Sequence, residues 1–363
     1  MNHKAILIAA IALVAVLAIM PSDTSEGART IEIEDGLGNN FVFDGPVDKV
    51  VSIGKGVSAT IIRIGAVDKI VVTDSYTKTD SDVFFKPLQD RIASGDVAAG
   101  GNIYSSGREQ LKTDIIDAAD NGFDRDKDVV IITGSDTYRA PVVDFLKEKG
   151  FKNILQWNDI KEYDDIEDFA EAISLVCTGS VHPSIEKLDY VPDHIEDVLK
   201  DNKVPKAEAF YVTYSANTFK VGNTGSLANS MIIAAGGRSI TTDPSKAGST
   251  YAANLTDLVA SHPGVIIFAD NTVASNPSYL SDLKKAVGND VKIVPLKPMW
   301  NNYCIESIDG VWTMACAMYP DYFEGDVPSV PEADSNDIVI YAAIGVIVVA
   351  VIGGGAYFFM RRP

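Results

Sequence analysis

Two uncharged apolar segments lie near the two ends of this chain, and they constrain its organisation more than any other feature. One covers residues 5–20 and the other residues 338–360. The second is long enough to cross a bilayer and is followed directly by Arg361 and Arg362. Residues 338–360 are therefore predicted to be a transmembrane anchor. A buried core helix is the less favoured interpretation, because the segment is terminal and has basic flanking residues.

The first apolar segment is shorter and begins directly after Lys4. These features are typical of a signal peptide or a short signal anchor, so residues 1–20 are interpreted that way and residues 21–29 as a linker. Cleavage stays open, because no clear cleavage site of small residues follows. Basic residues beside apolar segments stay in the cytoplasm, so both ends predict that the body between them is extracellular.

The charge of the chain excludes one class of partner. Asp and Glu number 50 against 31 Lys and Arg, which gives a formal net charge of −19. Three of the basic residues lie in the tails, so the body is still more acidic. Nucleic-acid binding needs net neutralisation of phosphates by basic residues, so neither DNA nor RNA is expected as a partner.

The first half of the body alternates short apolar strands with helical segments. Residues 30–43 have the pattern of a β-hairpin, and apolar runs at 49–53, 70–72, 129–132 and 153–155 are typical of buried strands. Helices are expected between them, for example from Ser58 to Gly65 and over 140–149. This alternation predicts an α/β fold with a parallel sheet.

The alternation stops between about residues 164 and 202 and then resumes. Helices are predicted over 166–176 and 184–199, with Pro192 expected to kink or divide the second. Strands then follow at 209–212, 265–268 and 291–294, with helices at 227–235, 255–261 and 308–318. The body is thus predicted to be two α/β lobes joined by a helical stretch, and residues 325–337 an acidic linker that contains proline.

Several segments of the body, in this order and spacing, resemble a known family. They are residues 31–38 (IEIEDGLG), 48–53 (DKVVSI) with 58–60 (SAT) and 65–71 (GAVDKIV), 220–227 (KVGNTGSL) with 235–237 (AGG), and 291–294 (VKIV) with Trp300, 309–310 (DG) and 317–323 (AMYPDYF). Together they are similar to the substrate-binding proteins of ABC importers that take iron–siderophore, haem and cobalamin complexes. The resemblance covers about residues 30–324.

The resemblance implies a class III periplasmic-binding-protein fold. Two Rossmann-like lobes, residues 30–181 and 202–324, would be joined by a single long backbone helix over residues 182–201. The ligand would lie between the lobes at the carboxyl ends of the strands, in agreement with the general rule for α/β sheets. The protein would deliver a metal chelate to an ABC permease with a separate cytoplasmic ATPase. A membrane-anchored protein of this kind is expected in an organism without a retaining outer membrane, such as an archaeon.

The family often carries one glutamate on each lobe that pairs with arginines of the permease. Asp114 stands near the first of these positions, and Asp257 lies beside Thr256 at the second. Asp114 and Asp257 are the candidate docking residues. Because neither is the usual glutamate, an alternative stays open, namely a surface-anchored sensor or scavenger of the same fold without a dedicated permease.

Candidate ligand-binding residues follow the predicted strands. Lys55, between Gly54 and Gly56 at a strand-to-helix turn, would favour an anion, and aromatic residues at strand ends suit flat apolar ligands. The candidates are Lys55, Tyr76, Tyr138, Trp157, Tyr214, Asn271, Trp300 and Tyr303. Each residue also has an ordinary structural interpretation. Arg108 and Arg139 are further cations, for which exposure to solvent is the simpler expectation.

No catalytic motif is present in the sequence, which lacks G-x-S-x-G, H-E-x-x-H and C-x-x-C, and no P-loop motif is found. An exported α/β enzyme is therefore the least favoured class. The histidines do not have the spacing of metal ligands, so neither a bound metal nor a resident cofactor is expected. A disulfide between Cys304 and Cys316 stays open beside the alternative of three free thiols.

Overall fold

A β-hairpin opens the part of the chain that the computed structural model describes, which is residues 30–104 and 106–331. The predicted leader (1–20), its linker (21–29) and the predicted anchor (338–360) lie outside these residues, as do residues 332–337 of the predicted linker at 325–337. Among the described residues, none of the helices has the length and apolarity needed to cross a membrane.

The hairpin pairs β1 (Ile31–Glu34) with β2 (Asn40–Phe43) in antiparallel register, as predicted. Asp35 closes its turn, because one carboxylate oxygen accepts hydrogen bonds from the amides of Leu37 (3.0 Å) and Asn39 (2.9 Å). The other oxygen accepts from the amide of Gln156 (3.1 Å), which ties the hairpin to the sheet behind it.

A four-stranded parallel sheet forms the centre of the N-terminal lobe, in the order β4-β3-β5-β6. Its strands are β3 (Val50–Ile53), β4 (Ile70–Thr73), β5 (Val129–Thr133) and β6 (Ile154–Trp157). All four strands were predicted to within three residues at each end. They are almost wholly buried, as expected for a parallel sheet with helices on both faces. The helical segments of this lobe are α2 (Lys55–Arg63), η1 (Val67–Lys69), α3 (Ser75–Thr79), η2 (Val83–Phe85), α4 (Lys86–Ser94), α5 (Arg108–Asp120) and α6 (Asp136–Glu148).

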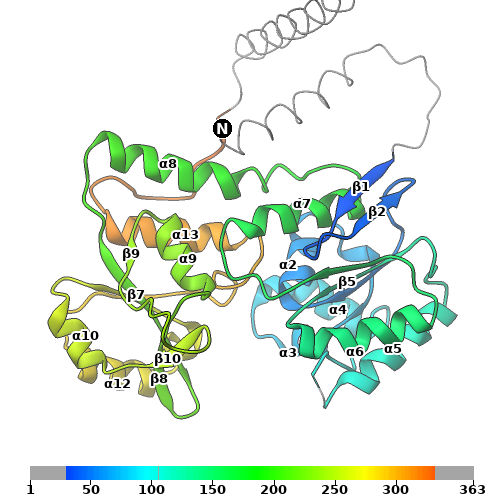
Figure 1. The fold of residues 1–363 in the computed structure, drawn as a ribbon, viewed down its shortest axis with the longest axis horizontal. Coiled ribbons are helices and arrows are strands. Elements are labelled where there is room, and N and C mark those ends of the chain that lie inside the picture. The colour runs from blue at the N-terminus through cyan, green and yellow to red at the C-terminus, as the bar shows by residue number, and fades with distance from the viewer. Residues whose placement is uncertain (1–29, 105, 332–363) are drawn as a thin grey trace, which may run out of the picture. The chain divides into compact units, whose positions relative to one another are not determined.

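Two helices, α7 (Asp165–Thr178) and α8 (Lys187–Asp201), lead from the first lobe to the second (Figure 1). The predicted backbone helix at 182–201 is therefore shorter than expected and begins at Lys187. The expectation that Pro192 divides it is wrong, since α8 runs through this residue. Its buried stripe of Leu188, Val191, Ile195 and Leu199 packs into the core, which offsets the backbone hydrogen bond that proline cannot make.

The C-terminal lobe contains a mixed sheet in the order β10-β8-β7-β11-β12, with β9 beside β7. Its strands are β7 (Glu208–Ser215), β8 (Thr218–Gly222), β9 (Arg238–Ser239), β10 (Thr250–Ala252), β11 (Ile266–Ala269) and β12 (Ile293–Pro295). Its helices are α9 (Leu227–Ala234), α10 (Leu255–Ser261), α11 (Asn271–Ala274), α12 (Pro277–Val287) and α13 (Ser307–Met318).

The antiparallel strands β8 and β10 were not predicted. Ala216 and Asn217 form the turn between β7 and β8, and both have positive φ angles, of 50° and 59°. Two-residue hairpin turns usually contain glycine at positions with positive φ. Because this turn has the sequence Ala-Asn, the hairpin of β7 and β8 could not be recognised from the sequence.

One apolar cluster runs through both lobes. It includes Val57 of α2, Phe169 of α7, Ile195 of α8 and Val311 of α13, all of them buried. A smaller cluster joins Ala59 and Phe85 of the first lobe to Met299 and Cys304 of the second. The lobes are thus packed together through α7, α8 and the loop before α13, and not only connected by the chain.

Candidate functional site

A cavity of about 620 Å³ opens at the carboxyl ends of β3, β4 and β5 in the N-terminal lobe. Because parallel strands end at the same edge of a sheet, the residues after each strand meet there. The lining residues are Ile53, Gly54, Lys55, Asp74, Tyr76, Thr79, Asp80, Ser81, Asn102, Ile103, Tyr104, Thr133, Gly134, Asp159 and Tyr303. We refer to this cavity as the strand-end cleft. All but one of its lining residues belong to the first lobe, and Tyr303 comes from the second.

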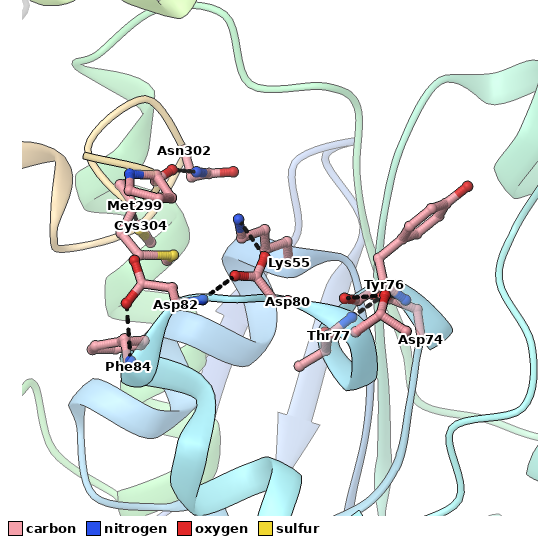
Figure 2. A network of polar contacts seen from close by, with 12 residues as sticks. Lys55, Asp74, Tyr76, Thr77, Asp80, Asp82, Phe84, Met299, Asn302 and Cys304 are labelled. Carbon is pink, nitrogen blue, oxygen red and sulfur yellow. Dashed lines mark hydrogen bonds and ion pairs between the residues drawn. The ribbon is translucent and has the colours of Figure 1, made fainter. Parts of the chain in front are cut away.

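The turn after β3 places Lys55 in the cleft. Gly54 has a φ of 122°, which favours glycine, and a Cβ atom there would lie 2.0 Å from Oγ1 of Thr133. Lys55 begins α2, and its Nζ lies 2.7 Å from Oδ2 of Asp80. Figure 2 shows this side chain directed at Asp80, whose carboxylate also accepts a hydrogen bond from the amide of Asp82 (2.8 Å). The predicted anion-binding lysine is therefore already paired.

Asp74 organises the turn after β4. Its carboxylate accepts hydrogen bonds from the amides of Tyr76 (2.9 Å) and Thr77 (3.2 Å) and so caps α3 (Figure 2). It also accepts a hydrogen bond from the amide of Gly54 (2.9 Å). Burial raises the pKa of this carboxyl, although the amide hydrogen bonds oppose that effect. Asp74 thus links the turn after β3 to the turn after β4.

Two exposed tyrosines, Tyr76 and Tyr104, line the cleft, and the predicted ligand residue Tyr138 does not line it but packs against Tyr104. The rings of Tyr76 and Tyr104 have centroids 5.8 Å apart, and those of Tyr104 and Tyr138 are 4.8 Å apart, both pairs in edge-to-face geometry. Their exposed fractions are 52%, 41% and 39% for Tyr76, Tyr104 and Tyr138. Large aromatic side chains left this accessible beside a concave wall are suited to contact a flat or apolar ligand.

Tyr303 enters the cleft from the opposite lobe. Its hydroxyl lies 3.0 Å from Oγ1 of Thr133, and its ring packs edge-on against Phe169 of α7 at 5.9 Å. Burial raises the pKa of Tyr303 to about 12, although the hydrogen bond with Thr133 opposes this. The phenol therefore stays protonated at neutral pH and joins the lobes through a neutral hydrogen bond.

The other predicted ligand residues do not line the strand-end cleft. Trp157 is buried against Phe169, with ring centroids 5.2 Å apart. Trp300 is half-buried beneath Lys297, whose Nζ lies 4.9 Å from its ring. Tyr214 stacks on Tyr279 at 4.0 Å. Asn271, the first residue of α11, uses its carbonyl to accept a hydrogen bond from the amide of Ser275.

The two arginines make structural contacts. Arg139 is fully buried, which contradicts the expectation of a solvated side chain. It donates to the side chain of Asn158 (3.2 Å) and pairs with Asp136 (3.3 Å). Arg108 donates through Nε to the carbonyl of Ile103 (3.1 Å) and does not line the cleft. Neither arginine is among the residues that line the cleft, although Arg139 also donates to the carbonyl of the lining residue Gly134 (3.4 Å).

The two candidate docking acids differ in exposure. Asp114 is buried and accepts hydrogen bonds from the amide of Gly100 and from Nε2 of Gln110, both at 2.8 Å. This carboxylate is occupied within the lobe and is not presented to a partner. Asp257 is exposed near the start of α10, where the side chain of Asn254 donates to it (2.6 Å).

A second cavity of about 630 Å³ adjoins the first and shares Asp159 with it. Trp157 lines it together with the carboxylates of Glu32, Glu34, Asp35, Asp159, Asp165, Asp168 and Glu171. We call it the acidic groove.

Within residues 30–104 and 106–331, no three His, Cys, Asp or Glu side chains are arranged to hold a metal ion. The cysteines at 177, 304 and 316 are all free thiols.

Sequence reasoning missed Asp74, Tyr104 and Asp159. Asp74 had a usable signal, since an aspartate directly after a strand and before a polar residue is typical of a helix cap. Tyr104 had none, because no predicted strand precedes it. The bridge between Val72 and Ala98 brings its loop alongside β4, a long-range contact that local patterns do not reveal.

Comparison of the sequence with models of protein families and with curated proteins gave no match. Solved structures do match the fold. The periplasmic vitamin B12-binding protein BtuF of Vibrio cholerae aligns with 75% of this chain and 97% of its own, at 17% identity and a TM-score of 0.52. The periplasmic heme-binding protein RhuT from Roseiflexus aligns with 76% of this chain and 98% of its own, at 13% identity and a TM-score of 0.54. The molybdate-binding protein MolA of Haemophilus influenzae aligns with 80% of this chain and 92% of its own, at 15% identity and a TM-score of 0.56. The described body therefore has the class III periplasmic-binding-protein fold.

Proposed function

We propose that this chain is an extracytoplasmic solute-binding protein that captures a metal chelate, namely a ferric siderophore, haem or cobalamin, in its strand-end cleft. The observation that carries the proposal is that residues of both lobes line the strand-end cleft. Exposed Tyr76 and Tyr104 of one lobe face an open concavity that Tyr303 of the other lobe completes. Proteins of the same fold are described as binding vitamin B12, heme and molybdate, which supports a binding role over a catalytic one.

Delivery to an ABC permease with its own ATPase is the second part of the proposal. The extracellular position of the body and its attachment by residues 338–360 rest on the sequence pattern of the two ends. A second candidate, a surface-anchored sensor or scavenger without a permease, is favoured by one observation. Asp114, the candidate docking acid of the first lobe, is buried. Uptake of the bound chelate by cells carrying or lacking a neighbouring permease gene would separate the two candidates.

The binding step is tested by titrating the full chain, in a neutral detergent, with ferric siderophores, haem and cobalamin. We expect one chelate per chain with a Kd on the order of micromolar or tighter, about −8 kcal/mol. Tyr104→Ala should weaken binding by about tenfold, since the ring contributes stacking and apolar contact. Tyr322→Ala is the matched control, because Tyr322 is equally exposed (43%) and lies outside the cleft wall. A folded protein that binds none of these ligands would refute the proposal.

A further inference from the structure

The charges that line the strand-end cleft are unbalanced. Lys55 is the one lysine or arginine among its lining residues in the described part of the chain, whereas Asp74, Asp80 and Asp159 all line it. A single cation therefore faces three carboxyl groups within one cavity of about 620 Å³.

The cation is not available to a ligand. Lys55 and Asp80 are both mostly buried, with 25% and 14% of their side chains exposed, and their charged atoms are 2.7 Å apart. Releasing Lys55 to an anionic ligand would leave the carboxylate of Asp80 without its cation in a partly desolvated site. That loss would offset the gain from a new ion pair.

Asp159 has no such directly paired cation. This residue is exposed and lines both the cleft and the acidic groove. Among residues 30–104 and 106–331, no hydrogen bond or ion pair engages its carboxylate. The charge of Asp159 is therefore free to act on whatever enters the cleft.

Besides burial, the negative charge of Asp159 and Asp74 raises the pKa of two tyrosines on opposite walls of the cleft. Burial raises the pKa of Tyr104, and Asp159 and Asp74 are among the further groups that raise it. The pKa of Tyr303 is raised mainly by burial and then also by the same two aspartates. The rings of Tyr76 and Tyr104, which also line the cleft, add to this, since the faces of aromatic rings carry partial negative charge and attract cations.

We propose that the strand-end cleft selects chelates that are neutral or carry net positive charge, and that Asp159 is the residue that sets this preference. The inference rests on the proposed chelate-binding function and adds the charge class of the ligand. Ferric trihydroxamates and cobalamins belong to the favoured class. Ferric tris-catecholates, haem with its two propionates, and oxyanions belong to the disfavoured one.

The first test compares probes by charge on the full chain. Ferric desferrioxamine B has a cationic amine, its N-acetyl derivative is neutral, and its N-succinyl derivative is anionic, with the same iron chelate in all three. Cyanocobalamin, haem and ferric enterobactin extend the panel. We expect the tightest binder to be neutral or cationic, and affinity to fall by about tenfold or more from the cationic to the succinylated chelate.

The second test inverts the charge at one position. Asp159→Lys should shift the preference between the cationic and the succinylated chelate by at least tenfold toward the anion. Asp168→Lys makes the same change on α7, on an exposed residue that lines the acidic groove but not the cleft, and should leave the preference unchanged.

The outcomes separate the two proposals. Tightest binding of an anionic chelate, or an equal shift from both lysine variants, would overturn the charge inference and leave the binding function intact. A folded protein that binds no member of the panel would overturn the binding function, and the charge inference with it.

Discussion

The hydroxyl of Tyr303 and Oγ1 of Thr133 lie 3.0 Å apart, and this hydrogen bond links residues that are 170 positions apart in the chain and belong to different lobes. Thr133 ends β5 of the first lobe, and Tyr303 lies in the loop before α13 of the second. The contact therefore fixes one wall of the cleft relative to the other.

Tyr303→Phe removes this hydrogen bond and keeps the ring in place. We expect the free energy of unfolding to fall by about 0.5–1.5 kcal/mol, the net value of one hydrogen bond, as measured by urea denaturation. The loss should be modest because Oγ1 of Thr133 also lies 3.3 Å from the carbonyl of Ile53. Tyr322→Phe is the control, since that tyrosine is exposed. Equal losses in both variants would show that the link between the lobes contributes no stability.

Gly56→Ala tests how closely the two lobes approach. A Cβ atom at this position would lie 2.3 Å from Cδ2 of Tyr303, well inside contact distance. We expect a loss of about 1–3 kcal/mol in unfolding free energy, although alanine is the better helix former. In a Tyr303→Ala background the cost should shrink but not vanish, because the Tyr303 carbonyl would still lie 2.5 Å away. The same cost in both backgrounds would contradict the close packing.

The pair of Lys55 and Asp80 is expected to be structural. Lys55→Met leaves the mostly buried carboxylate of Asp80 without its cation, and we expect a loss of about 1–3 kcal/mol in unfolding free energy. Lys55→Met combined with Asp80→Asn should be more stable than the sum of the single changes predicts, by about 1 kcal/mol. Strictly additive single and double variants would mean that the ion pair contributes nothing.

Local sequence patterns were sufficient for most of the fold. The apolar runs at β3, β5 and β11 appear within one residue of the predicted positions, because buried parallel strands have continuous apolar sequences. Helix α10 has the predicted bounds. The patterns failed where the decisive contact is distant. The start of α8 and its passage through Pro192 depend on packing against the core, and β8 depends on an unusual turn at Ala216.

The candidate site was predicted only in part. Lys55, Tyr76 and Tyr303 line the cleft, because position at a strand end or in the following loop was a sound criterion for them. The same criterion chose Trp157, whose side chain points into the core, and Trp300, which lies under Lys297. A sequence places a residue at a strand end but does not show the direction of its side chain or the charge of its neighbours. The pairing of Lys55 with Asp80 was hidden for that reason.

Glu167 of α7 should make the stability of the protein depend on pH. Burial, and the nearby carboxylates of Asp189 and Glu171, raise the pKa of this half-buried side chain from 4.5 to about 7. The folded protein therefore holds this proton more tightly than the unfolded chain does. The stabilising contribution is complete below pH 4.5 and is lost as the pH rises to about 7.

Glu167→Gln removes the charge in that window. We expect it to raise the free energy of unfolding at pH 8 by on the order of 1 kcal/mol, a value discounted because the side chain is half exposed, and to have almost no effect at pH 4. Glu196→Gln, an exposed glutamate on α8, is the matched control and should change neither value. Denaturant titrations of both variants across pH 4–8 measure the difference. A gain at pH 4 as large as that at pH 8 would show that the substitution acts through packing, and not through the charge of Glu167.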